Sequence, residues 1–281
     1  MGEVRRTKKS GHTRRDFYMF TSIQSYWSVL WQMLYADFLT FKPMMKSKLI
    51  DLFIYISITV VVMGYLLTSF GVRADFGIFT AATLVGSVAM FEIYPRAAAI
   101  VMDLTGNKVI TYDLILPLPS WLAITRIAIT TALQSLFMSF FALPIGLLFV
   151  YNQFDPSHFS IGWVIALLIM SNLFFGFFSL FLSSFVQNIQ QLGSCWMRII
   201  FPLWTLGGFQ FTWAVLFAKS KVLGYIALLN PCLYAQEGMR AAILGQGENL
   251  PCWICFVALA ILTTLCAWIS VKRMMKRLDC V

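Results

Sequence analysis

The segment from Asn230 to Arg240 combines helix-capping and charged residues near the C-terminal end of an otherwise apolar chain. Asn230 can accept a hydrogen bond from a free N–H group of the first turn, and Pro231 suits the first helical position because its missing N–H would be unpaired there. Glu237 precedes Arg240 by three residues, a spacing and order that stabilise a helix. We expect an ion pair that holds the segment together rather than catalytic chemistry. The alternative is a water-exposed pair worth less than about 1 kcal/mol.

Acidic residues mark a second segment, at Glu92, Asp103 and Asp113. Glu92 precedes Arg96 by four residues, so the two charges can pair on one helix face if Pro95 only kinks the helix. We expect this structural pair. In the functional alternative, Glu92 is a gate or a contact at the cytoplasmic mouth of a transport path. A membrane-embedded transferase acting on lipid-linked substrates would need acids clustered near one interface. These three acids therefore support that enzyme as the alternative function.

Other chemistry finds little support in the residues. The chain has no Gly-x-x-x-x-Gly-Lys-Ser/Thr loop, so it does not hydrolyse ATP by that route. His12 and His158 lie far apart, and no second cysteine pair completes a zinc site with Cys252 and Cys255. We therefore expect no catalytic residue, metal or cofactor in this chain.

The composition indicates an integral membrane protein. Of 281 residues, 59% are hydrophobic and 12% charged, with a mean hydropathy of +0.78, whereas soluble domains carry about 25% charged residues. The apolar runs are continuous rather than alternating, which predicts an all-α fold and not a barrel. Six runs are long enough to span: Leu49–Phe70, Phe76–Tyr94, Ile127–Tyr151, Ile161–Val186, Ile199–Phe217 and Cys252–Val271.

The basic residues behind the net charge of +9 are distributed as in a membrane protein, and this distribution does not indicate nucleic-acid binding. If both termini are cytoplasmic, the inner segments hold all of the 21 Lys and Arg residues except Arg73, Lys219, Lys221 and Arg240. This distribution is what the positive-inside rule predicts for six spans. We therefore expect the lipid bilayer, and no nucleic acid, as a partner.

Three regions follow from these patterns. Residues 1–20 are predicted to form a basic cytoplasmic tail, and residues 21–48 an amphipathic, aromatic-rich helix in the membrane interface. The alternative for 21–48 is a soluble helix that packs on another domain. Residues 49–275 hold the six spans.

The predicted helix from Pro231 to Leu244, with Gly245 as its stop, measures roughly 21 Å. It is too short to cross a core of about 30 Å.

The fifth run contains helix-weakening residues at Pro202, Gly207 and Gly208. They indicate either a moving element or close helix packing, and the sequence does not choose between them.

Together these features resemble the type 2 permeases of ATP-binding-cassette (ABC) exporters. The resemblance covers about residues 20 to 275 and is most specific at Leu229–Gly245, which is similar to the family's Asn-Pro-x-x-x-x-x-Glu-x-x-Arg stretch. It implies short re-entrant helices before the last span, over residues 222–246. The residues carried over to this external gate are Asn230, Pro231, Tyr234, Glu237 and Arg240.

The resemblance also implies a coupling loop over residues 95–125, with a coupling helix at about Arg96 to Tyr112 and a proline-containing turn at Leu116–Ser120. Asp103-Leu104-Thr105-Gly106-Asn107 stands where family members often have an acid before a Gly-Thr pair. The residues assigned to the cytoplasmic mouth and coupling are Glu92, Arg96, Asp103, Gly106 and Lys108.

The implied function is that of the permease subunit of an ABC exporter in a bacterial inner membrane, with several passes and both termini in the cytoplasm. Two permease subunits, identical or related, would form the pore. A separate ABC subunit would bind and hydrolyse ATP with magnesium. The cargo would be a glycan, a lipid-linked molecule or a hydrophobic compound.

Overall fold

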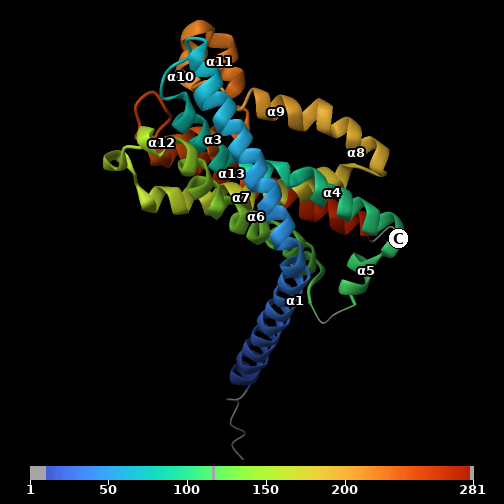
Figure 1. Cartoon of the computed structure of the whole chain (residues 1–281). Coiled ribbons are helices and arrows are strands. Elements are labelled where there is room, and N and C mark those ends of the chain that lie inside the picture. The colour runs from blue at the N-terminus through green and yellow to red at the C-terminus, as the bar shows by residue number, and fades with distance from the viewer. Residues whose placement is uncertain (1–10, 116–117, 279–281) are drawn as a thin grey trace, which may run out of the picture.

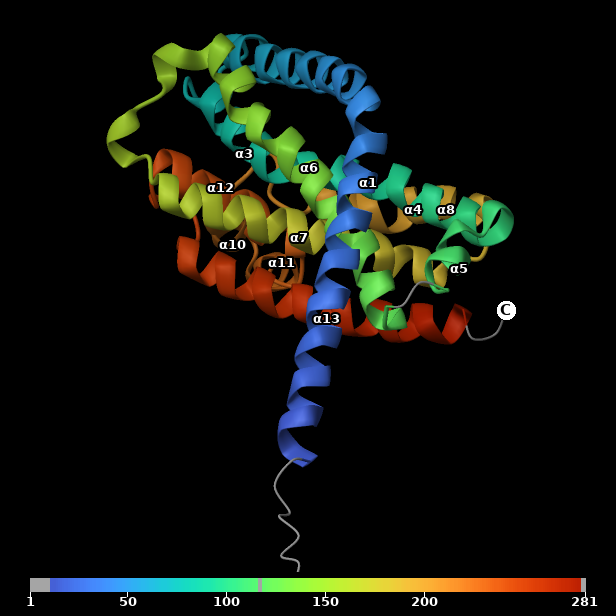
Figure 2. The ribbon, with the colours of Figure 1, turned by 90° about the horizontal axis from the view of Figure 1, so that it is seen from below.

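The computed structural model describes residues 11–115 and 118–278, with side chains from residue 26 onward except at residue 107. Within these ranges the chain forms helices and no strand. Figures 1 and 2 show a bundle of long helices from which the N-terminal part of the first helix projects. The all-helical prediction is confirmed.

The elements follow one another with short connections. The long helices and their extensions are α1 (Gly11–Val61), a π-helical turn (Val62–Leu66), α2 (Leu67–Ser69), α3 (Phe76–Phe91), α4 (Ile93–Met102), α6 (Ser120–Val150), α7 (Ile161–Phe185) and α13 (Cys252–Leu278). The short elements are a π-helical turn (Asp103–Asn107), α5 (Val109–Asp113), 3-10 turns (Tyr151–Gln153 and Pro156–His158), α8 (Ile189–Cys195), a π-helical turn (Trp196–Ile200), α9 (Phe201–Thr205), α10 (Trp213–Lys219), α11 (Lys221–Ala227) and α12 (Pro231–Leu244).

Among the described residues, five helical stretches are long and apolar enough to cross a membrane: Tyr26–Ser69, Phe76–Gly106, Ser120–Gln153, Ile161–Phe185 and Cys252–Leu278. The run Ile199–Phe217, expected as a single fifth span, is instead divided. Helix α9 ends at Thr205, and α10 begins only at Trp213. Gly208 lies between them with φ +85°, a conformation that only glycine adopts readily. The two glycines therefore end the helix rather than merely weaken it.

Helix α1 joins three regions that the sequence analysis separates. It runs without a break from Gly11, inside the predicted tail, through the predicted interfacial helix and into the first span. No glycine interrupts it before Gly64, and Pro43 removes one backbone hydrogen bond without ending it. Trp27, in the part predicted to lie in the interface, is 68% exposed. The predicted tail residues 1–10 lie outside the described part of the chain.

The centre of the bundle is formed by α3 and α12. Of the 16 residues of α3, 13 are buried, and α12 packs against α3, α7 and α13. At Gly86 of α3, an added Cβ would lie 2.5 Å from the carbonyl oxygen of Ala235. A glycine is thus required where α3 and α12 approach most closely.

Candidate functional site

The capped segment singled out in the sequence forms α12 with the predicted ends. The Asn230 side chain accepts a hydrogen bond from the N–H of Cys232 at 3.0 Å, and Pro231 occupies the first helical position. At the other end, Gly245 has φ +89°. The predicted capped helix is thus confirmed. It could be predicted because its start and stop depend on local backbone chemistry.

Helix α12 is almost wholly enclosed by other helices, with 12 of its 14 residues buried. It runs antiparallel to α3. Arg240 donates to the hydroxyl of Thr83 at 3.1 Å, and one turn earlier Gln236 donates to the hydroxyl of Ser87 at 3.0 Å. Polar residues of the second span thus face polar residues of α12. These α3 residues were not predicted as part of the site, although small residues at four-residue spacing are a known signal for close helix packing in membranes.

The predicted ion pair between Glu237 and Arg240 is present and completely buried. Nη2 of Arg240 lies 2.5 Å from Oε1 of Glu237, and both side chains are 0% exposed. The guanidinium also donates to the carbonyl oxygens of Gly208 at 2.6 Å and Phe211 at 3.4 Å, and it lies 4.5 Å from the ring centre of Phe79. The water-exposed alternative is therefore wrong.

The carboxylate of Glu237 is fully occupied by donors. Oε1 accepts the backbone N–H of Trp213 at 2.8 Å, and Oε2 accepts that of Leu250 at 2.9 Å. A buried charge is tolerated when it is paired and its remaining lone pairs are hydrogen-bonded. The pair thus ties α12 to the segment before α10 and to the segment before α13. With its oxygens engaged, Glu237 has a structural role in this arrangement.

Tyr234 and Asn230 attach the start of α12 to neighbouring segments. The Tyr234 hydroxyl donates to the carbonyl oxygen of Leu228 at 2.6 Å, and the Asn230 amide donates to that of Leu203 at 2.7 Å. Of the five predicted gate residues, only Tyr234 is partly exposed. An apolar pocket lies beside this point, lined by Pro202, Leu203, Leu206, Leu216, Leu223, Ile226, Ala227, Leu229 and Asn230.

At the other end of α3, Glu92 pairs with Lys48 of α1. The predicted pair of Glu92 with Arg96 is therefore wrong. Pro95 interrupts the hydrogen bonding between α3 and α4 without ending the helical path, since the Arg96 N–H still reaches the Glu92 carbonyl at 3.2 Å. Glu92 pairs instead with the long side chain of Lys48, which packing places beside it. Helical spacing cannot indicate such a tertiary contact.

The predicted coupling segment consists of two helical pieces rather than one. The Asp103 carboxylate accepts the backbone N–H groups of Val109 at 2.9 Å and Ile110 at 2.8 Å, so it caps α5. Lys108, with φ +55°, forms the corner before α5. Gly106 lies on the open side of this corner, where an added Cβ would meet no atom within 4 Å. Residues 116–117 of the predicted proline turn lie outside the described part of the chain.

A second charged cluster joins α1, α5 and α6. Arg126, 12% exposed, pairs with Asp113 and lies 3.5 Å from Asp37. Thr130 also donates to Asp37, at 2.6 Å. Burial raises the pKa of the Asp113 carboxyl above its ordinary value, and the nearby Arg126 charge opposes that rise. Asp37 lies in the predicted amphipathic helix, and sequence spacing does not indicate its role here because its partners lie about ninety residues away in the chain.

A cavity of about 320 Å³ lies beside this cluster. Its charged lining residues are Asp37, Arg96, Asp103, Asp113 and Arg126. Two of the three acids considered for a transferase thus share a cavity, whereas Glu92 lines a different one. Both shared acids have partners, Asp103 as a cap and Asp113 in an ion pair. Neither is a free carboxylate of the kind that general acid-base chemistry needs.

Comparison of the chain with protein-family models, with curated proteins and with solved structures finds no match. The function proposed below therefore rests on the sequence and on the geometry described above.

Proposed function

We propose that this chain is the permease subunit of an ABC exporter, which moves a glycan, lipid-linked or hydrophobic substrate outward across a bacterial inner membrane. A separate ABC subunit binds ATP and magnesium and supplies the energy. Two permease subunits, identical or related, form the transport path.

The observation that carries the proposal is the depth of α12. Cys232, at its start, lies against Met90, with their sulfur atoms 3.7 Å apart. Met90 is 14 residues beyond Phe76, the first residue of α3, which corresponds to about 21 Å along the helix. A short helix with a buried charge pair therefore lies well within the thickness of about 30 Å that α3 crosses. This position supports a re-entrant element, as the resemblance implies.

A sixth crossing is made by the divided segment. Helix α8, the following π-helical turn and α9 contain 7, 5 and 5 residues in continuous helical order, a length of about 26 Å. This stretch covers most of a core of about 30 Å, and the glycines after it direct the chain into α10 and α11. With six crossings, both termini lie on the cytoplasmic side, in agreement with the distribution of the Lys and Arg residues outside this stretch. Arg198 lies within it.

The corner formed by α4 and α5 serves as the coupling element. Capping by Asp103 gives this corner a fixed shape, and the pair of Asp113 with Arg126 attaches it to α6. A movement imposed on α5 by an ATPase is thereby transmitted to a spanning helix. The Lys48 pair with Glu92 links the same end of the bundle to α1.

The test is co-expression of the chain with the ABC ATPase encoded nearest to its gene. We expect the two proteins to co-purify and to hydrolyse ATP in nanodiscs, with loss of hydrolysis when the Walker lysine of the ATPase is replaced. Purification without the ATPase, or activity of the single chain on lipid-linked substrates without nucleotide, would overturn the proposal. ATP-independent flux in liposomes would instead indicate a passive channel.

A further inference from the structure

Arg96 is a charged side chain with no ion-pair partner in the described part of the chain. It lines the cavity of about 320 Å³ beside α5, and no hydrogen bond or ion pair engages its guanidinium. Its sequence neighbour Glu92 is paired with Lys48. A guanidinium in a part-buried site without a partner is costly, so this cavity is suited to an anionic ligand.

Glu92 and Asp37 lie near enough to attract the Arg96 charge, but neither forms a salt bridge with it, and the acids of the cavity are bonded to other groups. Asp103 uses both oxygens to cap α5. Asp113 is paired with Arg126, and Asp37 accepts the Thr130 hydroxyl and lies beside Arg126. Arg126 also has a buried Nε without a hydrogen-bond partner. Arg96 and Arg126 thus have N–H groups without an acceptor among the described residues, whereas each of the three carboxylates has a hydrogen-bond or ion-pair partner.

The depth of Arg96 indicates the source of the anion. Arg96 lies 20 residues beyond Phe76 along α3 and α4, or about 30 Å, which is the thickness of the hydrocarbon core. Because Phe76 begins its helix at one membrane face, Arg96 lies at the level of the lipid headgroups on the other. Phosphate groups of lipids are the anions concentrated at that depth.

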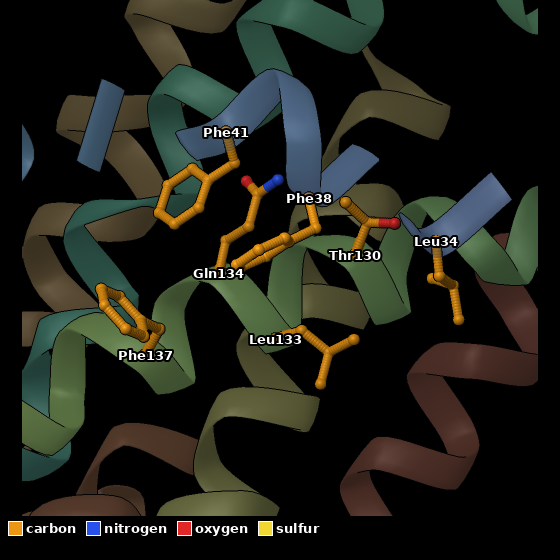
Figure 3. Close-up of a pocket in the computed structure, with 7 residues that line it drawn as sticks. All are labelled: Leu34, Phe38, Phe41, Thr130, Leu133, Gln134 and Phe137. Carbon is orange, nitrogen blue, oxygen red and sulfur yellow. The ribbon is translucent and has the colours of Figure 1, made fainter. Parts of the chain in front are cut away.

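An apolar groove continues from this cavity along α1 and α6. Thr130 lines both spaces, and Figure 3 shows the groove with Leu34, Phe38, Phe41, Leu133, Gln134 and Phe137 as its other lining residues. The groove is shallow, about 60 Å³, so a hydrocarbon chain would lie along it rather than enter it. Gln134 is 9% exposed, and its Oε1 has no hydrogen-bond partner. The groove therefore suits an occupant with a polar group beside an apolar chain.

We propose that the Arg96 cavity and the α1–α6 groove together bind an amphiphile, with its phosphate at Arg96 and its hydrocarbon chain along Phe38 and Leu133. The ligand is an anionic phosphate-bearing lipid of the leaflet at the Arg96 end. The inference goes beyond the proposed function, because such a lipid binds whether or not the chain moves a substrate.

The experiment is native mass spectrometry of the detergent-purified full chain with defined probes. We expect saturable binding of dioleoylphosphatidylglycerol, weaker binding of dioleoylphosphatidylcholine, and none of glycerol 3-phosphate, which lacks the chain. Arg96→Gln should weaken binding of phosphatidylglycerol about tenfold, since a charge-assisted hydrogen bond is lost. Arg198→Gln is the matched control, because Arg198 is exposed and lies outside both spaces. It should leave binding unchanged.

Two further arms separate the parts of the proposal. Leu133→Gln, at a groove position that is 50% exposed, should weaken lipid binding even if Arg96→Gln fails to fold. Competition by undecaprenyl phosphate would identify a lipid-linked molecule as the occupant, and its absence would identify a membrane phospholipid. Equal binding by the wild type and a folded Arg96→Gln variant overturns the phosphate site. Equal binding by the wild type and Leu133→Gln overturns the groove.

Discussion

The side chains of Glu237 and Arg240 show how a charge can be kept inside an apolar bundle. Each has several partners from segments that are distant in sequence, so neither partner can be removed without leaving the other unpaired. We expect Arg240→Ala to destabilise the chain by about 3–5 kcal/mol, the usual effect of breaking a buried pair. Thermal unfolding in detergent measures this loss.

The exposed pair of Arg73 with Asp75 is the control for that prediction. Arg73 and Asp75 are 65% and 54% exposed, and an exposed pair contributes about 0–1 kcal/mol. Arg73→Ala should therefore change the unfolding temperature little. The assignment of a structural role to the buried pair fails if the two arginine variants unfold at the same temperature.

Asp103 acts on one short helix through its two backbone contacts. Asp103→Ala should free the N–H groups of Val109 and Ile110, at a cost of about 0.5–2 kcal/mol, as for other helix caps. Hydrogen exchange followed by mass spectrometry should show faster exchange in α5 and unchanged exchange in α12. Asp103→Asn keeps one of the two acceptor oxygens and should exchange at a rate between those of the wild type and Asp103→Ala. Unchanged exchange in Asp103→Ala would contradict the capping role.

Asp113 gives the stability a defined dependence on pH. Because burial raises its pKa in the folded chain above the ordinary 3.8, the folded state holds this proton more tightly than the unfolded state. The contribution of Asp113 to the free energy of unfolding therefore falls as pH rises from about 4 towards the raised pKa. The unfolding temperature of the wild type minus that of Asp113→Asn should decrease over this range. A difference that stays constant or increases would contradict the direction of the shift.

At the scale of elements, the contact between α3 and α12 depends on the absence of a side chain at Gly86. A methyl group there would meet the Ala235 carbonyl at 2.5 Å, so Gly86→Ala should destabilise the chain by about 1–3 kcal/mol. Gly193→Ala in α8, where nothing lies within 4 Å, should be neutral or slightly stabilising. Thermal unfolding of both variants checks the prediction. Equal unfolding temperatures would show that α3 and α12 are not tightly packed.

The elements that the sequence predicted best are those whose signals are local. Helix α12 was predictable because its cap, its first-turn proline and its terminal glycine all lie within its own sequence. The partner of Glu92 was not predictable, since Lys48 reaches it only through the packing of α1 against α3. The undivided α1 was missed for a different reason. A change in composition near residue 48 suggests a boundary, but the backbone has no residue there that ends a helix.

At the scale of the whole molecule, the proposed topology places residues on defined sides of the membrane. We expect Ser157→Cys and Ser220→Cys to react with a membrane-impermeant maleimide added outside, and Gln187→Cys to react only after permeabilisation. The background is a variant in which the 6 native cysteines are replaced. Gln187 tests the divided fifth segment directly, because it is exposed and precedes α8, where the proposed crossing begins, whereas Ser220 follows the crossing. Labelling of Gln187→Cys from outside would rule out six crossings with both termini inside.

The enclosure of α12 also has a consequence for how the chain is made. The helix emerges from the ribosome before α13, yet one partner of Glu237, the Leu250 N–H, lies between the two. Helix α12 also packs against α13 itself. A nascent chain that ends before Cys252 therefore leaves a charged helix without its full enclosure. Insertion of α12 into the bundle must be among the last events of biogenesis, which makes the unfinished chain a natural target for membrane quality control.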